Sequence, residues 1–291
     1  MKSGQEGVKH EAAKAFALTE GWVGSGWGLN GSDYADQIKD GCTDVQTYLA
    51  LAAHRFPQDA SLAKAAKAIA VEMASGDICW TYDPRKGEYW CGKVTGDFVY
   101  RQGGMFDEYD LHLLRPCRWA LAGTADAIPG AVRRGFAGPF GAVTQLTTDK
   151  ERIINAARYA LGEPNVEIFG DLFEAASPED LEDLVALFLQ DHGWRLLPST
   201  SKTSMASYEF VVVESKSGRR AGVQVKSGNV SYLEQAVAED FDSFFVFLAG
   251  KNPRIIGDHK AEIIDRENLR RFALNNLAII PKRLAAVWAV S

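Results

Sequence analysis

Residues 208–226 read YEFVVVESKSGRRAGVQVK, and this stretch decides the fold expected for the second half of the chain. Two β-rich runs flank a polar turn that contains glycine, which predicts a β-hairpin. Side chains alternate between the faces of a strand, so Gln224 and Lys226 share a face, and Glu209 begins a similar alternation on the first strand. We therefore expect a carboxylate, an amide and an ammonium group at one end of a small sheet. That grouping suits a divalent cation and a phosphodiester.

A helix is expected just upstream of this hairpin. Ser177 followed by Pro178 is a helix start, Asp180 lies three residues after the cap, and Gly193 suits the helix end. Apolar residues recur between them at helical spacing: Leu181, Leu184, Val185, Phe188 and Leu189. Glu182 flanks this stripe, so we expect its side chain to face the edge of a neighbouring sheet.

Further elements complete the pattern around the hairpin. Residues 194–197 are expected to form a short strand, residues 231–240 a mostly helical stretch, and residues 244–249 an apolar strand. The expected order is therefore helix, three strands, helix, strand. An ordinary amphipathic hairpin with solvated charges would explain the alternation equally well, but it would not explain the acid on the helix or the order of the elements.

This order, with an acid on the helix, an acid on the second strand and Q-x-K on the third, resembles the PD-(D/E)XK nuclease superfamily. The similarity is to its Mrr-like branch and spans roughly residues 171–250. It implies an α/β domain of restriction endonuclease-like αβββαβ order. Two positions depart from the usual pattern, because Glu209 stands where Asp is usual and the neutral Gln224 stands where many members have a carboxylate.

The resemblance also implies the roles of the site residues. Glu182 matches the helix acid, which would act through a water or a second metal. Glu209, Gln224 and the carbonyl of Val225 would hold Mg²⁺ or Mn²⁺, and Lys226 would position the attacking water. The implied activity is that of a metal-dependent endodeoxyribonuclease.

Composition and charge limit the class of protein. The 291 residues leave room for two domains, and 46% hydrophobic with 24% charged residues is ordinary for a globular protein. We find no signal peptide and no run of 18 apolar residues, so we expect a cytoplasmic protein without a membrane partner. The four cysteines have no metal-site spacing, which favours reduced thiols. Residues 151–199 hold 3 basic and 10 acidic residues, whereas residues 200–291 hold 13 basic and 10 acidic ones.

Breaks in periodicity divide the chain. We expect a first domain over residues 1–136, a linker over 137–170 that contains a short helix at 149–161, and a second domain over 171–291. The first domain is expected to carry helices near 44–53 and 62–73 and strands near 78–82, 88–94, 95–100 and 111–119. These elements favour an α+β domain built on a strongly bent, barrel-like β-structure.

Four short motifs of the first domain resemble an EVE-like domain of the PUA superfamily, over roughly residues 20–135. They are G-W-G at 26–28, S-G-D-I-C-W at 75–80, Y-W-C-G-K-V-T-G-D-F-V-Y at 89–100 and H-L-L-R-P-C-R-W at 112–119. The strand expected before G-W-G is not evident, because residues 8–18 read as helical. The resemblance implies that a modified base is read in an aromatic pocket. The candidate pocket residues are Trp27, Trp80, Trp90, Tyr100, His112 and Arg115.

Each of these residues also has a structural interpretation. Trp27 is either a pocket wall or a core residue, and of Trp80 and Trp90, on neighbouring strands, at most one is expected to reach a ligand. His112 is either a base reader or a hydrogen-bonded structural residue. Arg115 contacts phosphate or pairs with an acid among residues 107–110.

Together the two halves predict a modification-dependent, type IV-like DNA endonuclease, acting in defence against foreign DNA. Cutting both strands needs two sites, which favours a homodimer. Two alternatives remain open from the residues. In one, the nuclease fold is degenerate and the chain only senses modified nucleic acid. In the other, the chain is an antiviral effector nuclease whose first domain senses a nucleotide-like trigger.

Overall fold

The computed structural model describes residues 7–137, 143–201, 208–228, 231–233, 241–251, 254–256 and 261–288. The chain divides into two compact units, Met1–Val166 and Glu167–Ser291. The helix expected inside a linker is α6 (Lys150–Ala160), and it belongs to the first unit. Within the described residues, no helix is both long and apolar enough to cross a membrane.

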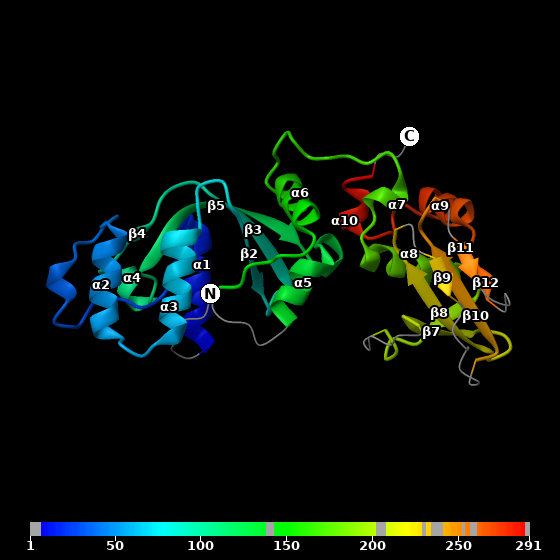
Figure 1. Ribbon diagram of the computed structural model, residues 1–291, viewed down its shortest axis with the longest axis horizontal. Coiled ribbons are helices and arrows are strands. Elements are labelled where there is room, and N and C mark those ends of the chain that lie inside the picture. Colours follow the sequence, from blue (N-terminus) through cyan, green and yellow to red (C-terminus); the bar gives the residue numbers. More distant parts are fainter. Residues whose placement is uncertain are drawn as a thin grey trace. The chain divides into compact units, whose positions relative to one another are not determined.

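The first unit is built on one curled antiparallel sheet (Figure 1). Its strands are β1 (Trp22–Ser25), β2 (Ile78–Asp83), β3 (Glu88–Val94), β4 (Val99–Tyr100) and β5 (Leu113–Gly123). The order is β1-β5-β3-β2, and β4 also pairs with β5. The sharp turn between β2 and β3 follows from Gly87, whose φ of 67° is open to glycine at no steric cost. The expectation of an α+β unit with a bent β-structure is confirmed.

Helices cover this sheet in separate patches. They are α1 (Gly7–Glu20), α2 (Val45–Arg55), α3 (Ala60–Ala66), α4 (Met105–Glu108), α5 (Gly130–Ala137) and α6, with short helical turns η1 (Ala35–Gln37) and η3 (Ala125–Ala127). Tyr48 of α2 packs with Tyr100 and Leu113 in one core, and Ala157 and Leu161, in and just after α6, pack on Cys91 in another. The aromatic side chains are therefore shared among several small cores.

Three local features differ from the sequence expectations. The helix expected at 62–73 changes after Ala66 into a π-helix, η2 (Lys67–Glu72). The carbonyls of Ile69 and Ala70, near its end, accept hydrogen bonds from Arg115. The strand expected at 95–100 is limited to β4. A strand does precede G-W-G, since β1 pairs with β5 directly after α1.

The second unit is built on a mixed five-stranded sheet of order β12-β10-β8-β7-β6. The strands are β6 (Trp194–Leu196), β7 (Phe210–Glu214), β8 (Arg220–Lys226), β10 (Ser243–Leu248) and β12 (Glu262–Ile263). Strands β6, β7 and β8 run antiparallel, and β8, β10 and β12 run parallel. The predicted hairpin is thus β7–β8, and the expectation of an α/β second unit is met at this coarse level.

Helices α7 (Leu172–Ala175), α8 (Pro178–Asp191), α9 (Arg266–Asn275) and α10 (Lys282–Ala285) complete the second unit. Helix α8 begins with the predicted capping box: Asp180 N–H donates to Ser177 Oγ at 3.2 Å, and Ser177 N–H donates to Asp180 Oδ2 at 2.8 Å. The buried Arg283 of α10 reaches the same carboxylate, with Nε 2.5 Å from Asp180 Oδ1.

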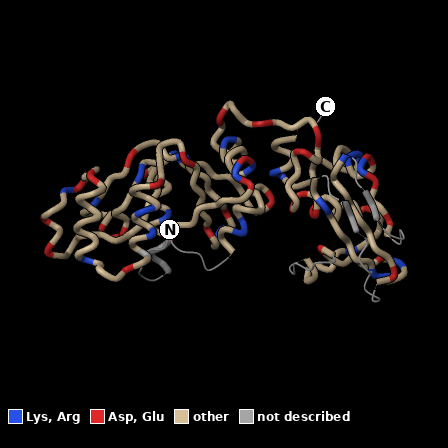
Figure 2. Tube along the Cα trace, viewed as in Figure 1, with Lys and Arg blue, Asp and Glu red and all other residues tan. Residues whose placement is uncertain are grey.

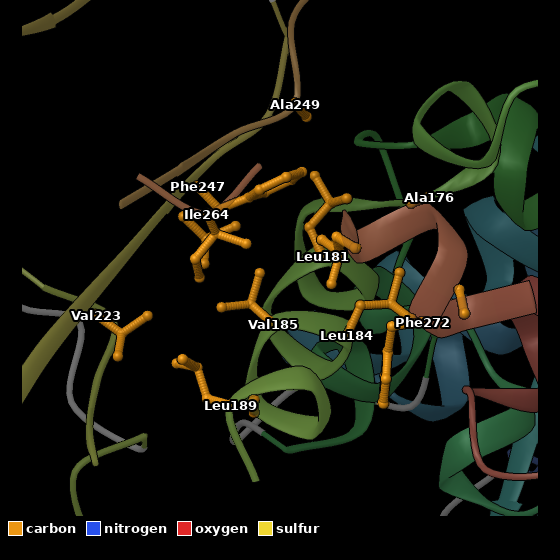
Figure 3. Close-up of a cluster of buried hydrophobic side chains, with 14 of the residues drawn as sticks. Ala176, Leu181, Leu184, Val185, Leu189, Val223, Phe247, Ala249, Ile264 and Phe272 are labelled. Atoms are coloured by element: carbon orange, nitrogen blue, oxygen red, sulfur yellow. The ribbon is translucent and has the colours of Figure 1, made fainter. Parts of the chain in front are cut away.

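The apolar stripe of α8 packs on one face of this sheet (Figure 3). Leu181, Leu184 and Val185 are fully buried, and they share a core with Val223 of β8 and Phe247 of β10. Burial of a leucine side chain stabilises a fold by about 1.5–3 kcal/mol. This stripe therefore fixes which face of β8 is covered by the helix.

One predicted element differs from the structure at its start. The stretch expected to be mostly helical at 231–240 begins as a strand, β9 (Ser231–Leu233), which pairs in parallel with β11 (Arg254–Ile256). Pairing with a distant strand satisfies its backbone groups, which local periodicity does not reveal. Residues 234–240 lie outside the described residues.

Candidate functional site

Three of the predicted nuclease residues, Glu209, Gln224 and Lys226, lie where β7 and β8 separate. Phe210 is the first residue of β7 and faces Val223, and the Glu209 N–H donates to the Val223 carbonyl at 2.8 Å. Glu209 therefore comes one residue before the ladder, and its backbone is still held against β8 at Val223. Lys226 Nζ is 3.6 Å from Glu209 Oε1, so the structure brings the predicted acid and the predicted lysine together.

Gln224 occupies the same face of β8 as Lys226, because side chains alternate along a strand. Only 6% of Gln224 is exposed, and its register partner on β10 is Val246. On this face, Val246, Phe244 and Leu248 form an apolar cluster against which Tyr208 and Phe241 pack. The Gln224 amide therefore lies in an apolar environment, which strengthens electrostatic interactions.

The carbonyl of Val225 points to the other side of the strand. Ala249 N–H donates to the Lys226 carbonyl at 2.9 Å, so Lys226 uses β10 for its backbone pairing. Backbone groups alternate along a strand, so the Val225 carbonyl turns toward the β7 side. Strand β7 begins at Phe210, opposite Val223, so its ladder ends two residues before Val225. The backbone thus directs this carbonyl to the side of β8 on which Glu209 lies, and its convergence with the Gln224 side chain stays a prediction.

Glu182 stands apart from this group. It is half-buried on α8, and α8 packs on the face that carries Val223 and Val225, opposite the face of Gln224 and Lys226. To contribute, its carboxylate would have to reach past the edge of the sheet. Its role stays a prediction.

The donors at this site are all oxygens: one carboxylate, one amide and one main-chain carbonyl. Hard divalent cations such as Mg²⁺ prefer such ligands, so the donor set fits the expected metal in kind. It supplies only one negative charge. Across the described residues, no group of three or more His, Cys, Asp or Glu side chains is placed to hold a metal ion.

In the first unit, Trp27 occupies a strained and tightly held loop. Its φ of 63° is left-handed, a conformation that costs a non-glycine residue about 1–2 kcal/mol. Its indole Nε1–H donates to Asp59 Oδ2 at 3.0 Å, and its carbonyl accepts from the Tyr48 hydroxyl at 3.0 Å. Two residues on, Leu29 N–H donates to the Tyr100 hydroxyl oxygen at 2.8 Å. Strain persists where the surroundings over-determine it, often at ligand sites.

His112 lies directly beneath this loop. It is 1% exposed and stacks on Tyr100 with ring centroids 6.0 Å apart. Its Nδ1 lies 2.8 Å from the Arg101 carbonyl, which can only accept, so Nδ1 carries a proton. A side chain at Gly28 would meet His112 Nε2 at 2.3 Å, which explains the second glycine of G-W-G. Trp27, Tyr100 and His112 are thus brought together.

Three of the predicted reader residues lie elsewhere. Trp80 pairs with Cys91 and Trp90 pairs with Thr81, so the two tryptophans point to opposite faces of the sheet. Arg115 is 6% exposed, and its Nε donates to the Ile69 carbonyl at 2.6 Å while its Nη2 donates to the Ala70 carbonyl at 3.1 Å. Burial lowers the pKa of this guanidinium.

The placement of Arg115 corrects two expectations. Its guanidinium holds the end of η2, so it is not available to a phosphate. Its nearest acid is Asp97, with Nη1 3.8 Å from Oδ1, rather than an acid among residues 107–110. In that range, Asp110 Oδ1 instead lies 3.6 Å from His112 Nε2.

Sequence reasoning missed two residues that hold Trp27. The sequence predicts for Tyr48 only a place in a helix. Asp59 also accepts from Leu62 N–H at 3.0 Å at the start of α3, and only that N-cap role has a sequence signal. Residues 29–44, which lead from this loop to α2, contain four aspartates and one lysine, and acidic positions stand out at this end of the unit (Figure 2).

Comparison with protein-family models, with curated proteins and with solved structures found no match for this chain. The functional argument therefore rests on the residues and their geometry.

Proposed function

We propose that this protein is a metal-dependent endonuclease that acts on DNA carrying modified bases. The observation that carries the proposal is the approach of Lys226 Nζ to Glu209 Oε1, 3.6 Å apart, on the face of β8 that also carries Gln224. The order α8, β6, β7, β8 and then the parallel β10 supports a restriction endonuclease-like, Mrr-like second unit. The curled sheet with the Trp27 loop supports an EVE-like first unit.

In this proposal, Glu209, the Gln224 amide oxygen and the Val225 carbonyl would hold Mg²⁺ or Mn²⁺. The metal would supply Lewis-acid polarisation of the scissile phosphate and a more acidic water. Lys226, on the exposed rim of the site, would orient the attacking water and neutralise charge on the reacting phosphate. Glu182 would act from the edge of the sheet, through a water.

The first unit would supply selectivity. A flipped base needs a rigid aromatic surface, and each stacked base contributes about 1–3 kcal/mol. Trp27 fits this part because its ring and its backbone are both fixed by hydrogen bonds. Two such chains would be needed to cut both strands, which is why we propose a homodimer.

The test is cleavage of otherwise identical plain, methylated and hydroxymethylated duplexes, with Mg²⁺, with Mn²⁺ and with EDTA. Metal-dependent cutting of one modified class is the expected result. Equal cutting of all three duplexes would remove the reader role. No cutting of any duplex at high enzyme concentration would remove the nuclease role.

A second candidate is a reader of modified nucleic acid without catalysis. The observation that favours it is the predicted donor set, in which Glu209 supplies the one carboxylate and Lys226 pairs with it. Selective binding of a modified duplex with no cutting in either metal would support this candidate over the first.

A further inference from the structure

Two basic side chains stand directly opposite each other in the first unit. Lys93 of β3 is the register partner of Arg118 of β5. By alternation they lie on the face of Cys91 and Ala120, the face that α6 covers. Like charges at directly opposed positions destabilise an antiparallel pair. Some group must therefore offset this pair.

That group is Glu163, three residues after the end of α6. A single oxygen, Oε1, lies 2.8 Å from Lys93 Nζ and 3.0 Å from Arg118 Nη2. Arg118 Nη1 also donates to the Leu161 carbonyl at 3.1 Å. The hydrogen bond from Lys93, with the nearby positive charges, holds the pKa of the Glu163 carboxyl below its usual range.

The geometry is that of an anion-binding site in which the bound anion is a carboxylate of the same chain. The Glu163 side chain is 15% exposed, whereas those of Lys93 and Arg118 are 36% and 52% exposed. The two cations thus remain partly open to solvent. An ammonium and a guanidinium around one oxygen also suit a phosphate, which offers more acceptor oxygens than a carboxylate.

We propose that Lys93 and Arg118 form a binding site for the phosphodiester backbone of nucleic acid, and that Glu163 occupies it as a displaceable internal counterion. The proposal rests on the nucleic-acid partner of the proposed function. Aspartates crowd the segments near Trp27, so backbone contacts have to come from another part of the unit. Glu163 also lies four residues before the start of the second unit, so the exchange would release the segment that leads into it.

The test compares Glu163→Gln with Glu151→Gln in the full chain. Both variants remove one negative charge, and Glu151 is an exposed residue at the start of α6. Binding of a plain, fluorescein-labelled duplex is followed by anisotropy over a series of salt concentrations. We expect Glu163→Gln to bind about three- to tenfold more tightly at low salt, with a salt slope steeper by about one to two contacts. Glu151→Gln should stay within about twofold of wild type.

A triple variant, with Lys93→Gln and Arg118→Gln added to Glu163→Gln, should lose the gain while keeping the melting temperature of the single variant. Equal gains from Glu163→Gln and Glu151→Gln would reduce the effect to overall charge and overturn the proposal. So would the absence of a gain in a Glu163→Gln protein that melts normally. Binding of inorganic tripolyphosphate by that variant, without a gain for duplex, would overturn the nucleic-acid partner.

These outcomes are separable from those of the proposed function. A gain from Glu163→Gln on plain duplex, combined with no selectivity for modified duplex in wild type, would remove the base reader and keep this site. Selective cleavage by wild type without any gain from Glu163→Gln would remove this site alone.

Discussion

Trp27 and Asp59 are joined by a hydrogen bond of 3.0 Å from the indole Nε1–H to Oδ2, across 32 residues of sequence. Asp59 is itself fixed, because Oδ1 accepts from Leu62 N–H at the start of α3. The ring of Trp27 is therefore tied to a helix end while its backbone is held in a left-handed conformation. A side chain held this way loses little conformational freedom when a ligand binds.

Two substitutions of Trp27 distinguish the contribution of its ring from the cost of its strained backbone. Trp27→Ala should weaken binding of modified nucleic acid by about 1–3 kcal/mol, the contribution of one stacked base, and leave plain duplex nearly unchanged. Trp27→Gly also lacks the ring but accepts φ of 63°, so it should be more stable than Trp27→Ala by about 1 kcal/mol. Titrations and urea unfolding measure the two effects. Equal weakening for both ligands would make Trp27 a general contact.

Removing either member of the Glu209–Lys226 pair should stop cleavage. We expect Glu209→Ala and Lys226→Ala to lose activity by about 10²-fold or more, because positioned charge and proton transfer are lost together, with binding kept. Single-turnover cleavage and anisotropy measure both. Lys216→Ala, in the exposed β7–β8 turn, is the matched control and should cut normally. Near-normal cutting by both site variants would remove this site.

Glu182→Gln should impair cleavage less than Glu209→Ala does. The reason is position, since α8 covers the face opposite Gln224 and Lys226. Asp191→Asn, at the exposed end of the same helix, is the control. A loss equal to that of Glu209→Ala would make Glu182 a direct ligand, and no loss would leave it a surface residue.

Arg115→Met should destabilise the first unit without changing the salt dependence of duplex binding. The substitution leaves the Ile69 and Ala70 carbonyls without their buried donor, at about 1–3 kcal/mol each. Arg115→Lys keeps the charge but not the planar fork, so it should recover only part of the loss. A normal melting temperature with a salt slope reduced by about one would show a phosphate contact instead.

Cys91 should make stability fall in alkali. Burial raises the pKa of its thiol from 9.0 to about 12. Above pH 9 the unfolded thiol ionises while the folded thiol keeps its proton, so its contribution to stability is complete below pH 9 and is lost as the pH rises toward 12. The stability difference between wild type and Cys91→Ala should therefore shrink by about 1 kcal/mol from pH 7 to pH 10. Urea unfolding at both pH values measures it, and an unchanged difference would contradict it.

The sequence predicts those features whose causes are local. The alternation of residues 208–226 gives the β7–β8 hairpin and places Gln224 beside Lys226, and the Ser177–Asp180 cap begins α8 as expected. Glu209 could be placed because it continues that same alternation. These interactions need only neighbours in the chain.

The features that could not be predicted depend on distant partners. Strand β9 forms because it pairs with β11, and the π-helix η2 ends where Arg115 reaches it. Nothing near Trp27 in sequence identifies Asp59 as its partner. Likewise, Lys93 and Glu163 become one cluster only when β3, β5 and the end of α6 meet.

In the second unit, a segment near its start pairs with the last described residues. Phe169 N–H donates to the Val287 carbonyl at 2.8 Å, and Phe169 forms a parallel bridge with Trp288. A short peptide could therefore join residue 288 to residue 169, and the ring could be reopened in the exposed turn between β7 and β8. Circular permutation of this unit, or its insertion into a loop of an unrelated carrier, should leave the β6–β7–β8 meander and the α8 core in place. We therefore expect the second unit to fold when its chain is permuted or placed in another protein.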